Sequence, residues 1–318
     1  MTEAFTIGNV RVTLWAVLAV AFALAALIYT VFALRRRGWT ALQAAVCGVS
    51  AAAVSLLLGR ALFFALRPEF LTDPMGDSLG LGPVFDPAVG SASVIGILAG
   101  LLLGSFLAAA AMKKDVISAW DALAVPGLVL FAAFRFIEPL TGQGFGPFLA
   151  DPALCFVPLG IQSGWGGWML SVCFIEGILL LAAAAATGLL KLKARGSKTL
   201  CALILLSLLQ IIPESLRMDN VLKIFIFARV TQLGYCAAMV ISAILCWRKA
   251  AGLGAGKGVI IREAVILVAG IALLVAGEFA LDKMDWPDWV IYVAMGIIIA
   301  GMTWMLLRRL VKNDWGTV

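Results

Sequence analysis

The sequence predicts an all-α fold: a polytopic transmembrane bundle of about nine helices. Three observations support this. First, 63% of the 318 residues are hydrophobic and only 13% are charged, whereas about 25% of the residues of a soluble domain are charged. Second, long apolar runs recur along the chain, and the mean hydropathy is +1.06. Third, basic residues gather in alternate loops. A chain of this composition can expose its outer surface to lipid only as closed hydrogen-bonded helices.

A helix of about 20 residues is needed to cross a hydrocarbon core of roughly 30 Å. Apolar runs of sufficient length predict helices at 11–34, 40–66, 93–112, 117–138, 167–190, 198–214, 220–247, 259–281 and 288–309. The first run lacks a basic segment before it and ends in Arg35, Arg36 and Arg37. We therefore interpret it as a membrane helix and not as a cleavable signal.

The loops differ in charge according to the side of the membrane they would face. One set is basic and includes Arg35–Arg37, Lys113, Lys114, Lys191, Lys193, Arg195, Lys198, Arg248, Lys249, Lys257, Arg262, Arg308, Arg309 and Lys312. The opposite loops, 67–92, 139–166 and 282–287, are mainly acidic. Since basic loops mark the cytoplasmic face, we expect the N-terminus outside and the C-terminus in the cytoplasm. This placement accounts for the net charge of +6 without a nucleic-acid partner.

Two of the outward loops, 67–92 and 139–166, are rich in glycine, proline and aromatic residues. Unstructured connections of this length are uncommon in compact domains. We expect them to be partly re-entrant or interfacial segments over the outer mouth of the bundle. The alternative is two ordinary loops at headgroup level, anchored by aromatic side chains.

The chain offers little for a metal or a disulfide. It has no histidine, so the commonest general base and metal ligand is missing. Its six cysteines are scattered without a CxxC pair, and five fall in predicted helices, where a thiol acts as a small apolar side chain. Cys155 lies in an outer loop. We therefore predict no metal, no disulfide and no cofactor.

Ionisable residues inside the apolar runs are the informative ones, because each costs about 2.5–3.5 kcal/mol at a helix centre unless it is paired or hydrated. They are Arg60, Arg135, Glu138, Glu176, Glu214, Arg217, Arg229 and Glu278. Arg135 with Glu138, and Glu214 with Arg217, are spaced i,i+3 and would each share a helix face. One interpretation is structural ion pairs with arginines that reach towards the interface.

Five of these residues fall at the predicted outward ends of their helices: Arg60, Arg135, Glu138, Glu214 and Arg217. Such a cluster at one depth predicts a polar cavity open to the outer leaflet. Guanidinium groups there could bind a phosphate with two hydrogen bonds each. Glu278 lies near the same face in a different segment of the chain, and we interpret it as a carboxylate that reaches the interface.

One segment has the form of a known signature. From Phe134 the chain reads Phe-Arg-Phe-Ile-Glu-Pro-Leu-Thr-Gly-Gln-Gly-Phe-Gly. This resembles Gly-Arg-x-Gly-Asn-Phe-x-Asn-Gly-Glu-x-x-Gly, the signature of the prolipoprotein diacylglyceryl transferase family of bacterial membrane enzymes. Arg135, Gly142 and Gly146 match in register, and Phe145 keeps an aromatic position. The resemblance extends over roughly residues 10–246.

Shorter stretches resemble the same family in the same order. The matching positions are Gly59-Arg60, Asp121, Pro126, Phe174-Ile175-Glu176, Glu214, Arg217 and Gln232. The sequence also departs from the family. Its histidine corresponds to Ser91, its signature asparagine to Glu138, its signature glutamate to Gln143, an arginine to Gln210 and a tyrosine to Leu206.

The resemblance implies a seven-helix domain over residues 1–250, in a bacterial inner membrane, and two added helices in 251–318. It implies transfer of a diacylglyceryl group from phosphatidylglycerol to the cysteine of an exported lipoprotein precursor. Glu138 or Glu214 would then accept the thiol proton. The lipid would contact Arg60, Arg135, Gly142, Gly146, Glu176, Gln210 and Arg217.

Two alternatives stay open from the sequence. The first is a non-catalytic lipid-binding or scaffold member of the same family, with a partner membrane subunit docked on the last two helices. The missing histidine and arginine favour it. The second is a transporter, which would use the same buried charges, but the sequence shows no paired inverted repeats.

Overall fold

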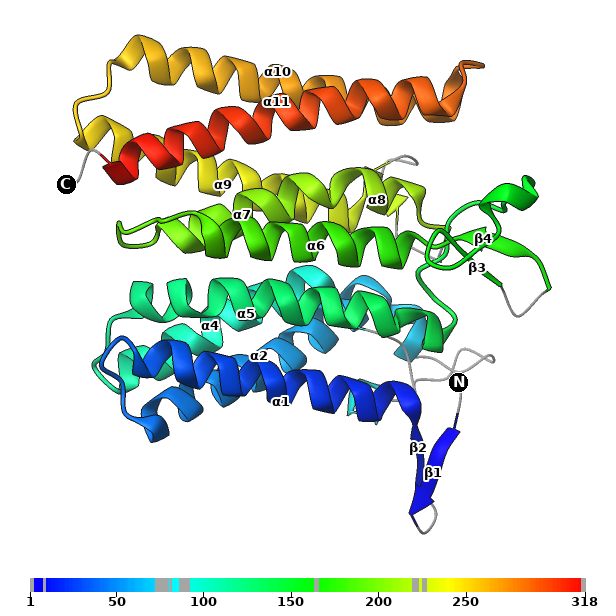
Figure 1. The fold of residues 1–318 in the computed structure, drawn as a ribbon, viewed down its shortest axis with the longest axis horizontal. Helices are drawn as coiled ribbons and strands as arrows, with labels where there is room; N and C mark the ends of the chain where they lie inside the picture. The colour runs from blue at the N-terminus through cyan, green and yellow to red at the C-terminus, as the bar shows by residue number, and fades with distance from the viewer. Residues whose placement is uncertain are drawn as a thin grey trace. The chain divides into compact units, whose positions relative to one another are not determined.

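The computed structural model describes residues 3–7, 10–71, 80, 82–85, 92–162, 166–218, 223–224 and 228–315 (Figure 1). Within this part of the chain, nine helices are long and apolar enough to cross a membrane. The predicted polytopic all-α fold is therefore confirmed. The predicted orientation of the helices in the membrane stays a prediction.

The helices are α1 (Leu14–Arg35), α2 (Ala41–Leu66), α3 (Gly82–Phe85), α4 (Val94–Ala111), α5 (Val116–Ile137), α6 (Val172–Leu189), α7 (Ser197–Leu209), α8 (Ile211–Leu216), α9 (Val230–Gly252), α10 (Lys257–Lys283) and α11 (Asp288–Trp315). Helices α7 and α8 together form one membrane span. Three short 3₁₀ turns lie at η1 (Pro68–Leu71), η2 (Glu138–Thr141) and η3 (Pro152–Leu154). Three antiparallel hairpins pair β1 (Glu3–Ile7) with β2 (Val10–Thr13), β3 (Gly160–Gln162) with β4 (Trp168–Leu170), and β5 (Lys223–Ile224) with β6 (Ala228–Arg229).

Most predicted helix limits agree with the structure to within three residues, but two predicted starts were too early. The helix predicted from residue 167 begins at Val172, because 168–170 pair with 160–162 as strands. The helix predicted from residue 220 begins at Val230, directly after the strand β6. Apolar composition alone does not distinguish a short strand from the first turn of a helix.

The chain divides into two compact units, residues 27–123 and residues 1–26 with 124–318, and each is described separately. In the first unit α2 and α4 pack closely and run antiparallel. Gly96, Gly100 and Gly104 recur every fourth residue on α4 and lie directly on the backbone of α2. A Cβ atom on Gly104 would come within 2.9 Å of the Cα of Ala51. Small residues at this spacing let two membrane helices approach closely.

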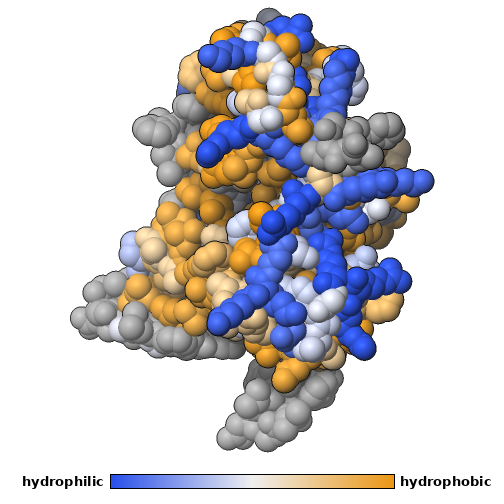
Figure 2. Space-filling model, turned by 90° about the vertical axis from the view of Figure 1, so that its left-hand side faces the viewer, coloured by the Kyte–Doolittle hydropathy of each residue, from blue (hydrophilic) through white to orange (hydrophobic). Residues whose placement is uncertain are grey.

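In the second unit, α7 packs against α6, α9 and α11. Helices α10 and α11 form a hairpin that also contacts α9, so the two C-terminal helices pack against the bundle (Figure 1). In Figure 2 hydrophobic side chains cover the flanks of the helices, and hydrophilic ones gather at the helix ends that face the viewer. Exposed apolar flanks are expected where lipid surrounds a bundle.

The second outer loop is folded. Between α5 and α6 it forms η2, η3 and the β3–β4 hairpin, which extends beyond the ends of these two helices (Figure 1). Its described residues form only 3₁₀ turns and strands, so they make an interfacial cap and not a re-entrant helix. Most of the first loop, 67–92, lies outside the described residues.

Candidate functional site

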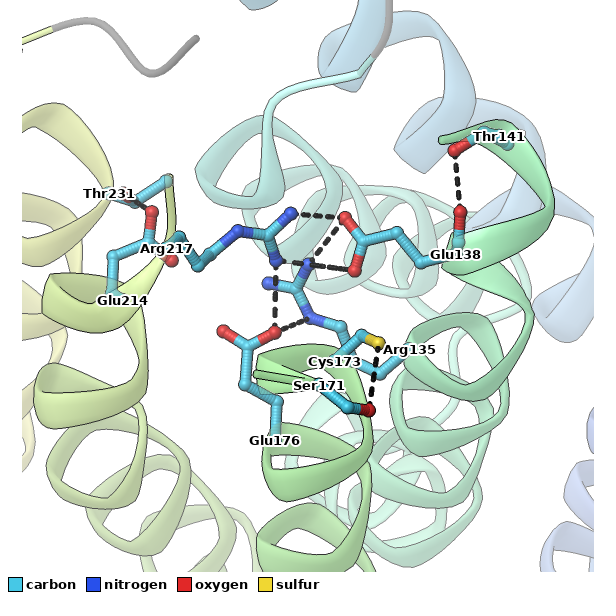
Figure 3. Close-up of polar contacts among 9 residues, drawn as sticks. All are labelled: Arg135, Glu138, Thr141, Ser171, Cys173, Glu176, Glu214, Arg217 and Thr231. Carbon is cyan, nitrogen blue, oxygen red and sulfur yellow. Dashed lines mark hydrogen bonds and ion pairs between the residues drawn. The ribbon is translucent and has the colours of Figure 1, made fainter. Parts of the chain in front are cut away.

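Four charged residues meet at one end of the second unit: Arg135 from α5, Glu138 from η2, Glu176 from α6 and Arg217 after α8 (Figure 3). We call them the charged quartet. Arg217 donates to both oxygens of Glu138, and its Nη1 lies 2.9 Å from Oε2 of Glu176. The two positive and two negative charges balance, which is how ionised groups are accommodated in a region of low dielectric constant.

The end of α5 places the first pair. Arg135 Nη1 donates to Glu138 at 3.1 Å and 2.9 Å from its two carboxylate oxygens, so the ion pair predicted from the i,i+3 spacing is confirmed. Helix α5 tightens into the 3₁₀ turn η2 at Glu138. Gly142 ends that turn with a φ of 76°, a left-handed conformation that glycine adopts without strain. Gly142 therefore shapes the chain next to the quartet.

Arg217 is held by its backbone. Helix α8 ends at Leu216, and Arg217 is extended, so the helix face that we predicted for Glu214 and Arg217 does not form. The N–H of Met218 donates to the carbonyl of Phe145 at 2.8 Å. A Cβ atom on Gly146 would lie 3.1 Å from the carbonyl oxygen of Leu216. The glycine thus allows the cap segment to lie against the end of α8.

Glu176 is the most deeply buried member of the quartet, with 0% of its surface exposed. Its Oε2 atom is shared by the two arginines, and Nε of Arg135 lies 3.0 Å away. Its other oxygen, Oε1, has no hydrogen-bond partner in the structure. A buried acceptor without a donor costs free energy, so Glu176 offers one unused position for a hydrogen-bond donor.

Glu214 lies beside the quartet, and it accepts a hydrogen bond from Thr231 Oγ1 at 2.5 Å. Helices α7–α8 and α9 run antiparallel here, since Lys249 near the end of α9 donates to Ser197 at the start of α7. One turn further from the Glu214–Thr231 contact along each helix lie Gln210 and Tyr235. Each is 1% exposed, and neither the Gln210 amide nor the Tyr235 hydroxyl has a partner.

These unpartnered groups belong to the surroundings of the quartet, because the charges of Arg135, Glu176, Glu214 and Arg217 all act on the Tyr235 hydroxyl. Buried polar groups in native proteins are nearly always paired with protein, water or ligand. Gln210, which we predicted to bind substrate, is therefore placed where a polar molecule could pair with it.

The sequence reasoning missed Gly144. Its φ is +86°, and a Cβ atom would lie 2.6 Å from the Cβ of Cys173 and 3.3 Å from Oε2 of Glu138. Its carbonyl accepts from the N–H of Cys173 at 3.0 Å. Only a residue without a side chain leaves Glu138 room here. Glycines every second residue at 142, 144 and 146 were the available signal.

Arg60 lies in the other unit. There it donates to the carbonyl of Val84 at 2.9 Å and lies over the ring of Phe64. Ser91, which stands where the family resemblance places a histidine, lies outside the described residues. That Arg60 and the quartet line one cavity stays a prediction.

The described residues contain no group of histidine, cysteine or acidic side chains that could hold a metal ion. The site therefore offers charge, hydrogen bonds and burial as its chemical means. Paired guanidinium groups recognise phosphate or carboxylate, and a carboxylate beside them can accept a proton once the arginines turn to a ligand.

No protein-family model matches the chain, and no curated protein matches it. The resemblance to the diacylglyceryl transferases stays a prediction, based on the motif positions alone.

Proposed function

We propose that the chain is a membrane-embedded transferase that moves a diacylglyceryl group from a phosphatidylglycerol-like lipid to a thiol acceptor at the outer leaflet of a bacterial inner membrane. The supporting observation is the charged quartet. It joins Arg135, Glu176 and Arg217, three residues far apart in the sequence that match the family's motif positions, in one buried contact network. An exported lipoprotein precursor would supply the thiol.

In this reaction the acceptor sulfur bonds to the terminal glycerol carbon of the diacylglyceryl group. The bond between that carbon and the phosphate oxygen breaks, and glycerol phosphate leaves with the electron pair. Arg135 and Arg217 would stabilise the leaving phosphate. The thiol proton passes to a carboxylate, for which Glu138 and Glu214 are the candidates.

Glu138 suits the role of base better than Glu214. In the empty site both arginines hold Glu138, and a carboxylate held by two guanidinium groups is a weak base. A bound phosphate would draw the guanidinium groups to itself and release Glu138 to accept a proton. Lipid binding would in this way prepare the base.

Complementation tests the proposal. A strain depleted of its own diacylglyceryl transferase should grow when it expresses the intact chain, and Glu138→Gln should abolish growth at equal protein level. Glu263→Gln is the matched control, because Glu263 pairs with Arg309 and lies outside the quartet. If the intact chain is inserted in the membrane and growth does not return, the transferase proposal fails.

The balanced charge of the quartet favours a second candidate, a non-catalytic lipid-binding or scaffold protein. Both guanidinium groups already have carboxylate partners, so the empty site has little net attraction for an anion. For this candidate, native mass spectrometry should detect phospholipid bound to the purified chain, and no thiol-linked product should form.

A further inference from the structure

The first turns beside the quartet are tied to the C-terminal hairpin by one carboxylate. Glu278 of α10 accepts from Ser215 Oγ of α8 through Oε2, and from Gln232 Nε2 of α9 through Oε1, both at 2.8 Å. Tyr292 of α11 also interacts with Ser215 and with the charge of Glu278. The residue that we interpreted from sequence as reaching the interface is instead bound inside the second unit.

Arg229 extends this contact to the quartet. Its Nη2 donates to the carbonyl of Ser215 at 3.1 Å and to that of Arg217 at 2.6 Å. Its own N–H donates to Gln232 Oε1 at 3.1 Å. A cation that binds the last carbonyls of a helix satisfies their unpaired acceptors and favours the helix dipole. Arg229 thus fixes the turn that carries Arg217.

The charges within this contact also match. Arg229 is buried, which lowers the pKa of its guanidinium, and the negative charges of Glu214 and Glu278 act in the opposite direction. Glu278 therefore favours the charged form of the residue that binds the Arg217 carbonyl. Two routes lead from Glu278 to Arg217: the hydrogen bond to Ser215 and the charge on Arg229.

We propose that Glu278 is a positioning residue for Arg217, so that the α10–α11 hairpin completes the candidate site. Through Ser215, Gln232 and Arg229 it holds the turn from which Arg217 reaches Glu138 and Glu176. The added helices then serve the same site as the first seven, a role distinct from the docking of a partner.

A double-mutant cycle tests the positioning without any assay of activity. The variants are Glu278→Gln, Arg217→Lys and their combination, and thermal unfolding of the purified full chain in detergent is measured. If Glu278 holds Arg217, the shifts in Tm are not additive, because the two changes disrupt one network. Additive shifts would overturn the proposal.

Glu263→Gln is the matched control for this cycle. It removes the same group from the same helix about 22 Å away, at a rise of 1.5 Å per residue over 15 residues. It should lower Tm through the loss of its contact with Arg309, yet its shift should add to that of Arg217→Lys. Coupling as large as that of Glu278→Gln would show a general loss of stability and overturn the proposal.

The activity arm rests on the proposed function. In a diacylglyceryl transfer assay, Glu278→Gln should lower kcat at least tenfold with KM within twofold, whereas Glu263→Gln should leave both within twofold. Equal losses in the two variants would contradict the positioning role. If the wild-type chain transfers nothing, the proposed function fails, and the double-mutant cycle still decides the role of Glu278.

Discussion

Nη1 of Arg217 lies 2.9 Å from Oε2 of Glu176, an oxygen that Arg135 also contacts. Two guanidinium groups therefore depend on one atom of a fully buried carboxylate. Neither arginine can leave without a change in the charge around Glu176. The stability of this end of the bundle and its capacity to bind an anion are accordingly linked.

The balance of charge predicts the effect of its removal. Glu176→Gln should destabilise the chain by about 3–5 kcal/mol, since it leaves a buried guanidinium charge without compensation. Thermal unfolding in detergent measures this loss. The double variant Glu176→Gln with Arg217→Gln keeps the site neutral and should lose less than the sum of the two single variants. A loss equal to the sum would mean that the charges are independent.

The glycines near Glu138 should respond differently to alanine. Gly142→Ala should cost about 1–2 kcal/mol, because its φ of 76° strains an L-residue while nothing lies within 4 Å of the new Cβ. Gly144→Ala adds an overlap with Cys173 to a similar strain, so its Tm should fall further. Equal shifts in Tm would show that Glu138 is not confined as closely as the structure indicates.

The unpartnered amide of Gln210 predicts opposite effects on stability and binding. Gln210→Leu removes a buried group that has no hydrogen-bond partner, so Tm should rise or stay unchanged. Phospholipid that co-purifies with the chain, measured by native mass spectrometry, should decrease if the amide contacts the ligand. Tyr235→Phe should behave in the same way. Lower Tm with unchanged lipid would identify Gln210 as a structural residue.

The glycine spacing on α4 can be tested against a glycine in open surroundings. Gly100→Ala places a methyl group on the backbone of Ser55, so α2 and α4 must separate and Tm should fall. Gly301→Ala on α11 meets nothing within 4 Å and should be neutral or stabilising by up to about 1 kcal/mol. A loss of Tm of the same size in both variants would contradict the close packing.

The sequence predicted the membrane spans well because an apolar run of sufficient length has few alternatives in lipid. It also predicted the pairing of Arg135 with Glu138, since their spacing is local. Contacts that depend on chain ends were less accessible. The end of α8 at Leu216, which directs Arg217 towards Glu176, follows from the packing of the cap segment against it.

The role of Glu278 was missed for a related reason. One carboxylate in an apolar run shows a cost but not its partner, and Ser215 and Gln232 lie 63 and 46 residues away in the chain. Gly144 was missed because its importance depends on the approach of Cys173 from another helix. Such long-range contacts leave no periodic pattern in the sequence.

The most direct measurement is transfer by the purified chain in phosphatidylglycerol vesicles to a peptide that carries a single lipobox cysteine. Mass spectrometry should detect a diacylglyceryl thioether with the wild-type chain and with Glu263→Gln. The charge-balanced double variant Arg135→Gln with Glu138→Gln should fold and yield at least a hundredfold less. A folded wild-type chain that retains phospholipid and forms no thioether would contradict the transferase and leave lipid binding as the function of the quartet.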